Sequence, residues 1–168
     1  MLAAIVVVLT FVGPTGRADE VYQDPRAFLE EVFGGTVPTP RKLWVTPDLR
    51  TQIRAIMGHD LGALRIRYWG APARTAWILD DIGKEQPITT GLLVEHGRLT
   101  EVRVLIYRES RGWEVRYPAF TEQFRGAGLT DTSALDRGID GISGATLSVH
   151  AMTRMARLAL LLDRHAGT

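Results

Sequence analysis

Cysteine is absent from this chain of 168 residues. Its absence excludes disulfide bonds, a thiolate metal site, a cysteine nucleophile, an iron–sulfur cluster and a lipidated N-terminal cysteine. The four histidines do not have the spacing of metal ligands, so the sequence predicts no metal site. Ser148 and His150 are two residues apart in a predicted helix and face apart, which argues against a Ser–His–Asp nucleophile.

The chain also lacks an excess of either charge, because 20 basic residues stand against 19 acidic ones. Such a balance gives no electrostatic reason to expect nucleic-acid or anionic-membrane binding. Hydrophobic residues make up 45% of the chain and charged residues 23%, which is ordinary for a globular protein. The length suits one domain with its own core.

The apolar run at the N-terminus, Leu2–Val12, is too short to cross a bilayer, which needs about 20 residues. Gly16 and Ala18 place small residues at the two positions that a signal peptidase reads. We therefore expect residues 1–18 to be a cleaved signal peptide and the protein to be exported, to the periplasm or the extracytoplasmic face of the membrane. No Lys or Arg precedes the apolar run. One alternative is therefore that the leader is longer and that Met1 lies within it. The other alternative is a buried N-terminal strand.

Residues 19–62 have the pattern of two helices. Asp24 and Thr46 each precede a proline, the usual arrangement of an N-cap and a first helical residue. Apolar residues follow at helical spacing in both segments, and a glycine ends each. Between the two helices, proline and polar residues at 37–42 predict a surface loop.

Residues 63–168 change from strand periodicity to helical periodicity. Apolar residues predict strands at 63–69, 76–79, 88–94 and 99–107, the last two joined as a hairpin. A helical turn at 120–124 and a long helix at 145–162 complete the pattern. The order helix, helix, strands, helix predicts an α+β fold in which helices pack on one face of an antiparallel sheet.

The most informative segment is Asp140–Thr146, Asp-Gly-Ile-Ser-Gly-Ala-Thr, which leads into the last helix. Free N–H groups at a helix start, together with the helix dipole, favour a phosphate there. Gly144 and Ala145 permit close approach of the phosphate. Ser143 is a candidate N-cap, and Thr146 presents the hydroxyl that a phosphoester needs. By spacing alone, the same pattern also begins many ordinary helices.

The segment resembles the Asp-x-x-Ser/Thr-Gly-Ala-Thr/Ser flavinylation motif of the FMN-binding domain family. This family includes the flavin-carrying subunits of the Rnf complex and of the sodium-translocating NADH:quinone reductase. The resemblance implies FMN attached covalently to Thr146 by a phosphoester. A dedicated flavin transferase, which recognises an acid at the position of Asp140, would install it. The FMN-binding domain is then expected at residues 63–168, after a helical segment at residues 19–62.

Two further segments, residues 79–89 and 107–126, are similar to segments of the same family. Relatives of the sodium-pump type carry Glu-Thr-Pro-Gly-Leu-Gly where this chain has Glu-Ser-Arg-Gly-Trp-Glu. Glu109 and Gly112 match that segment, whereas its proline and second glycine are replaced. The resemblance thus covers most of the chain after residue 64.

The turn that starts at Glu109 is the expected neighbour of the isoalloxazine ring. Gly112 would admit the flat ring and Trp113 would cover it, while Glu109 and Ser110 offer polar groups to its edge. Lys84 would place a cation near the phosphate or the reduced ring. The alternatives are a solvated turn for Glu109, a core or rim anchor for Trp113 and a solvated loop lysine for Lys84.

The resemblance implies an electron-transfer carrier. Its flavin would take electrons from one membrane or periplasmic redox partner and pass them to another, and no catalytic acid or base is evident. Two alternatives remain at this stage. One is a flavin-dependent reductase of a small acceptor, which needs a substrate pocket beside the ring. The other is a flavin-free binding module with the same fold.

Overall fold

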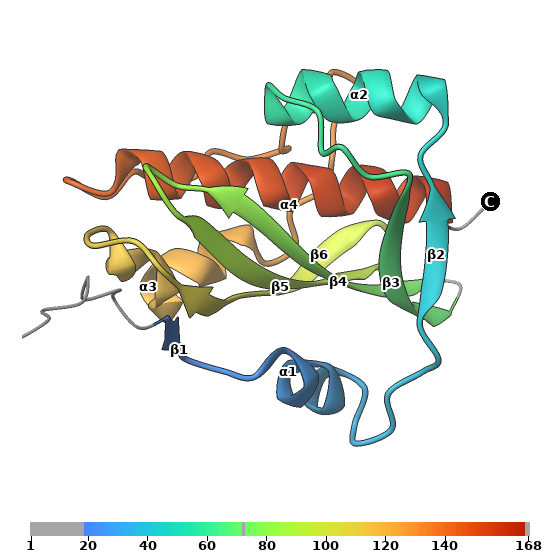
Figure 1. The fold of residues 1–168 in the computed structure, drawn as a ribbon, viewed down its shortest axis with the longest axis horizontal. Helices are drawn as coiled ribbons and strands as arrows, with labels where there is room; N and C mark the ends of the chain where they lie inside the picture. Colours follow the sequence, from blue (N-terminus) through green and yellow to red (C-terminus); the bar gives the residue numbers. More distant parts are fainter. Residues whose placement is uncertain (1–18, 72, 167–168) are drawn as a thin grey trace, which may run out of the picture.

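The computed structural model describes residues 19–71 and 73–166. The predicted signal peptide, residues 1–18, lies outside the described residues. Six strands form one antiparallel sheet in the order β1-β6-β5-β4-β3-β2 (Figure 1). The strands are β1 (Glu20–Val21), β2 (Arg41–Trp44), β3 (Arg65–Ala71), β4 (Arg74–Ile82), β5 (Pro87–Glu95) and β6 (Arg98–Tyr107). The helices are α1 (Pro25–Val32), α2 (Pro47–Met57), α3 (Pro118–Thr121) and α4 (Thr146–Ala166), with 3₁₀ turns η1 (Trp113–Arg116) and η2 (Glu122–Phe124). The α+β prediction is confirmed.

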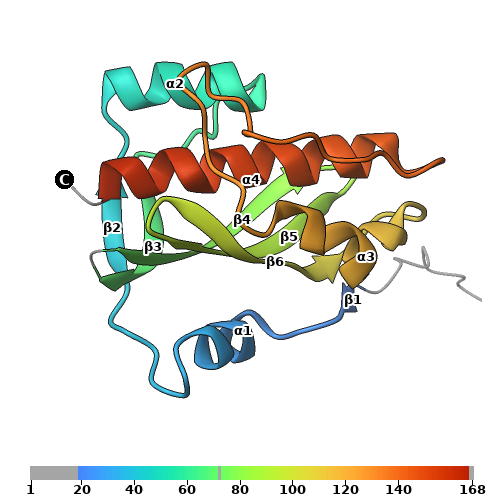
Figure 2. The ribbon, with the colours of Figure 1, turned by 180° about the vertical axis from the view of Figure 1, so that it is seen from behind.

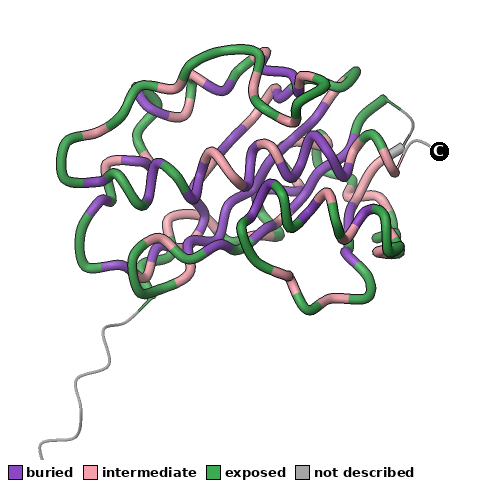
Figure 3. The backbone as a smooth tube through the Cα atoms, turned by 90° about the horizontal axis from the view of Figure 1, so that it is seen from above, coloured by how far each residue is buried: buried purple, intermediate pink, exposed green. Residues whose placement is uncertain are grey.

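Helices cover both faces of the sheet, not one as the sequence suggested. Helices α2 and α4 lie on one side of β4–β6, and α1 lies on the other (Figures 1 and 2). The reason is that the central strand β5 is buried on both faces along almost its whole length (Figure 3). On the α4 side Leu92 packs with Met152, and on the α1 side Leu93 packs with Phe28.

The predicted starts of the first two helices are confirmed. The Asp24 Oδ1 accepts hydrogen bonds from the backbone N–H groups of Arg26 and Ala27 at 2.8 and 3.3 Å. The Thr46 hydroxyl accepts from the Leu49 N–H at 3.3 Å. The hairpin is also confirmed, because Glu95 pairs with Arg98 across a two-residue turn.

The segment at residues 19–62 contains two strands as well as two helices. It supplies β1, which pairs with β6, and β2, which pairs with β3. Strand β2 begins at Arg41, inside the segment predicted to be a loop. The prediction failed because β2 has no buried residue, so its strand conformation comes from pairing with β3 and leaves no apolar alternation in the sequence. Within the described residues, no helix combines the length and apolarity needed to cross a bilayer.

Candidate functional site

Helix α4 starts from a tight turn that presents the Thr146 side chain to solvent. The Ala145 N–H donates to the Ile142 carbonyl at 3.0 Å, which closes a four-residue turn. Gly144, the third residue of this turn, has a φ of +80°, a left-handed conformation that glycine adopts without strain. A Cβ at Gly144 would meet no atom within 4 Å, so the backbone conformation, and not crowding, requires glycine here.

The start of α4 has no side-chain cap. The first helical hydrogen bond runs from the Val149 N–H to the Ala145 carbonyl, at 3.0 Å, so Ala145 occupies the N-cap position. Ser143 is two residues short of that position, and its prediction as the N-cap is wrong. Among the described residues, nothing accepts a hydrogen bond from the N–H groups of Thr146, Leu147 and Ser148. Three donors and the positive end of a 21-residue helix thus remain available to an anion.

A cavity of about 520 Å³ opens beside Thr146. Its lining comes from the turn after β4, the segment after β6 and the start of α4. The lining residues are Lys84, Glu109, Ser110, Arg111, Gly144, Ala145, Thr146, Leu147 and Ser148. Six of the ten predicted site residues are therefore brought together: Lys84, Glu109, Ser110, Gly144, Ala145 and Thr146. Residues from three distant parts of the sequence meet beside the Thr146 side chain.

Glu109 is a buried residue that organises one wall of this cavity. Its Oε1 accepts from the backbone N–H groups of Lys84, Glu85 and Gln86 at 2.5, 2.6 and 2.9 Å. Burial is the largest single effect on the pKa of Glu109 and would raise it, but these three hydrogen bonds outweigh burial and the pKa is lowered. The solvated-turn alternative for Glu109 is therefore wrong, because the carboxylate holds the Lys84 turn in place.

At Gly112 the backbone packs directly against the first turn of α4. A Cβ at this position would lie 2.7 Å from the Ser148 Oγ and 2.9 Å from the Tyr107 hydroxyl, and its φ is +85°. Because Ser148 and Tyr107 fill the space over Gly112, this glycine admits the start of α4 where the sequence suggested a flavin ring. No local pattern indicates this role, since Ser148 lies 36 positions farther along the chain.

Three residues of the lining were missed by the sequence analysis: Arg111, Leu147 and Ser148. The Arg111 side chain is exposed and has no acidic partner among the described residues, whereas the Lys84 ammonium lies 3.2 Å from the Glu85 carboxylate. Arg111 is therefore the uncompensated cation of the cavity. In the sequence, Arg111 could be connected with the site only by its position two residues after Glu109. The fold brings Arg111 opposite the start of α4.

Four predicted residues do not line the cavity: Asp140, Ser143, Gly112 and Trp113. Asp140 and Ser143 are exposed on the loop before α4. The Asp140 N–H donates to the Gln123 Oε1 at 2.7 Å, which anchors the loop to η2. Trp113 is 41% exposed at the start of η1 and does not reach the lining.

A second cavity, also of about 520 Å³, flanks Thr146 on the other side of the helix start. Its lining includes Arg137, Ile139, His150 and Arg157. Thr146 is the residue that the two cavities share. A group attached to its hydroxyl therefore has two possible directions along the surface.

Residues 83–161 match the model of the FMN-binding domain. The match contains β5, β6, the cavity beside Thr146 and most of α4. No curated protein and no solved structure is similar enough to this chain to give a match. The sequence resemblance is thus confirmed, and the chain carries an FMN-binding domain over residues 83–161.

Proposed function

We propose that the protein carries FMN covalently on Thr146, through a phosphoester, and transfers electrons with it. An FMN-binding domain indicates a flavin-carrying protein. The observation that supports Thr146 as the attachment point is the uncapped start of α4, where an exposed hydroxyl adjoins three free N–H groups.

The residues around Thr146 fit the phosphate of FMN. A phosphodiester anion beside Thr146 would accept from the N–H groups of the first helical turn, which lack partners within the described part of the chain. Arg111 supplies a guanidinium, which binds phosphate through paired N–H donors. Both features place positive charge where the flavin phosphate would carry its negative charge.

The attachment needs an activated donor of flavin phosphate and a flavin transferase. The Thr146 Oγ forms a bond to the flavin phosphorus, and the bond from that phosphorus to its leaving group breaks. The leaving group takes the electron pair of the broken bond, and the hydroxyl proton of Thr146 is released. Asp140 and Ser143, exposed on the preceding loop, are available for recognition by the transferase.

The bound flavin supplies the redox chemistry, while this chain sets its exposure and orientation. We propose that the protein is exported after removal of residues 1–18 and works at the extracytoplasmic face of the membrane. Its partners would be membrane or periplasmic redox proteins. A covalent link suits such a location, since FMN lost outside the cytoplasm is not readily replaced.

The test is the intact mass of the protein after co-expression with a flavin transferase, compared for wild type, Thr146→Ala and Ser143→Ala. We expect wild type to gain the mass of FMN less one water. Thr146→Ala should gain nothing, and Ser143→Ala should keep at least part of the modification because the acceptor hydroxyl remains. Flavin fluorescence on a denaturing gel gives an independent readout of the same link.

An unmodified mass in wild type, with the transferase shown active on another substrate, would refute attachment. The flavin-free binding module would then be the better interpretation. Modification of Thr146→Ala would move the acceptor to another hydroxyl.

A further inference from the structure

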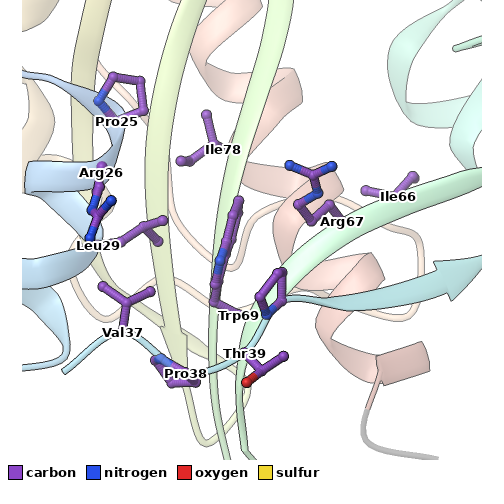
Figure 4. A pocket seen from close by; sticks show the side chains of 11 residues that line it. Pro25, Arg26, Leu29, Val37, Pro38, Thr39, Ile66, Arg67, Trp69 and Ile78 are labelled. Carbon is purple, nitrogen blue, oxygen red and sulfur yellow. The ribbon is translucent and has the colours of Figure 1, made fainter.

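A further cavity lies on the face of the sheet opposite α4, the helix that begins at Thr146. It has a volume of about 810 Å³, within the usual range for small-molecule sites. One wall is α1 with the loop that follows it, and the floor is formed by β3 and β4 (Figure 4). The lining is Pro25, Arg26, Leu29, Val37, Pro38, Thr39, Pro40, Ile66, Arg67, Trp69 and Ile78. None of the residues proposed to hold FMN belongs to it.

The cavity forms where strands β3 and β4 diverge. The two strands pair from Trp69–Ala76 to Ala71–Arg74, and the first half of β3 pairs with β2. Beyond Ala76, β4 has no strand partner on that side within the described residues. Helix α1 is short and does not close the gap, which leaves Trp69 and Ile78 only partly buried.

The charged side chains in the lining are all positive. The lining contains two arginines and no acidic residue. The Arg26 guanidinium pairs with the Glu30 carboxylate at 3.0 Å, whereas the Arg67 side chain has no hydrogen-bond or ionic partner within the described residues. Arg67 also stands directly across from Lys42 in the β2–β3 pair, a like-charge arrangement that destabilises a sheet. An anion beside Arg67 would relieve this repulsion.

The remaining walls are rigid and apolar. Figure 4 shows the Trp69 ring edge-on, with Leu29 and Val37 to one side and Arg67 to the other. Three proline rings, Pro25, Pro38 and Pro40, complete this part of the lining. Flat and rigid surfaces of this kind favour a planar ligand that stacks on the indole.

We propose that this cavity binds an aromatic carboxylate, with the ring against Trp69 and the carboxylate paired with Arg67. The aromatic body replaces water over Trp69 and Ile78, which gives hydrophobic binding energy. The Arg67 guanidinium then makes charge-assisted hydrogen bonds to the carboxylate and sets the orientation of the ligand. The site is separate from the proposed flavin site, because α4, which begins at Thr146, lies on the other face of the sheet (Figure 1).

The experiment is calorimetric titration of the full-length chain with 1-naphthoate as the probe. We expect saturable binding at one site. The neutral analogue 1-naphthylmethanol, which keeps the ring but has no carboxylate, should bind more weakly. Arg67→Ala should weaken naphthoate about tenfold, the effect of losing one charge-assisted hydrogen bond. Thr39→Glu, which places a carboxylate among the exposed lining residues, should weaken it as well.

Arg65→Ala is the matched control. Arg65 lies two residues from Arg67 on the same face of β3, but it stacks over Trp44, with its Cζ 5.2 Å from the ring centroid, and does not line the cavity. We expect its affinity for naphthoate to stay within about twofold of wild type. Thr146→Ala, which cannot carry the flavin as proposed, should bind naphthoate as wild type does.

Three results would overturn the proposal. The first is the lack of saturable binding by wild type. The second is equal weakening by Arg65→Ala and Arg67→Ala, which would indicate non-specific attraction to a basic surface. The third is loss of naphthoate binding in Thr146→Ala, which would indicate that naphthoate binds in the cavity beside Thr146. Because Thr146→Ala is tested separately, failure of this proposal leaves the flavin proposal untouched.

Discussion

The hydroxyl groups of Tyr107 and Ser148 lie 3.0 Å apart, and this contact joins the end of β6 to the first turn of α4. The Tyr107 hydroxyl donates to the Arg111 carbonyl at 2.5 Å, so its proton is used and Ser148 donates to Tyr107. The chain that carries Arg111 is thereby held against the helix that carries Thr146. Gly112 makes this approach possible, because any side chain there would displace one of the two hydroxyls.

We predict that Gly112→Ala destabilises the protein by about 2–5 kcal/mol. Strain of the left-handed backbone costs about 1–2 kcal/mol, and overpacking against Ser148 and Tyr107 adds about 1–3 kcal/mol. Gly97→Ala is the control, because Gly97 is also left-handed but a Cβ there meets nothing within 4 Å. Urea denaturation of both variants measures the difference, and equal losses would show that the contact with α4 adds nothing.

Glu109→Gln tests the three hydrogen bonds that hold the Lys84 turn. We expect a loss of about 1–3 kcal/mol near neutral pH, since a neutral amide replaces a carboxylate that accepts three N–H groups. Glu85→Gln serves as the control, because the Glu85 side chain is exposed and its carboxylate pairs with the exposed Lys84 ammonium. A Glu109→Gln variant as stable as wild type would contradict the assignment.

The same carboxylate predicts a dependence of stability on pH. Its pKa in the folded state is lowered below the ordinary value of 4.5. The stabilisation is therefore fully present above that value and is lost as the pH falls through the folded-state pKa. Denaturation curves between neutral and acid pH should show a steeper loss for wild type than for Glu109→Gln. Parallel curves would mean that another carboxylate accounts for the loss.

Arg111→Ala tests the cation that sequence analysis missed. If the phosphate of FMN lies in the cavity beside Lys84 and Arg111, this variant should be flavinylated more slowly than wild type while its folding is unchanged. Arg137→Ala is the matched control, because Arg137 lines the cavity on the other side of Thr146. Time courses of FMN incorporation give the readout. A slower reaction in Arg137→Ala alone would place the phosphate on the opposite side.

Arg154→Leu tests a buried ion pair between α4 and β4. The Asp81 side chain is 1% exposed and accepts from the Arg154 Nε at 2.7 Å and from the His59 ring at 3.3 Å. Removal of the guanidinium leaves that carboxylate largely uncompensated, which should cost about 3–5 kcal/mol. The double variant Asp81→Asn with Arg154→Leu should recover part of the loss in thermal or urea denaturation. No recovery would attribute the cost to packing alone.

Local features were predictable because their signals lie within a few residues. The N-caps Asp24 and Thr46 needed only their own first helical turn, and the hairpin needed only its turn and two alternating arms. Asp80 is exposed and Asp81 is buried because adjacent residues of a strand point to opposite faces. Strand β2 was not predictable, since its conformation depends on β3 more than 20 residues away.

The sequence by itself therefore determined the principal helices, the strands β3 to β6, the α+β class and the segment that ends at Thr146, because each depends on periodicity or on a short motif. The tertiary structure alone decided which side chains meet there. It showed Glu109 holding the Lys84 turn, Arg111 opposite the helix start, and a glycine at 112 in contact with Ser148. These relationships join residues far apart in the chain, and their energies depend on distances that exist only once the sheet and α4 have packed together.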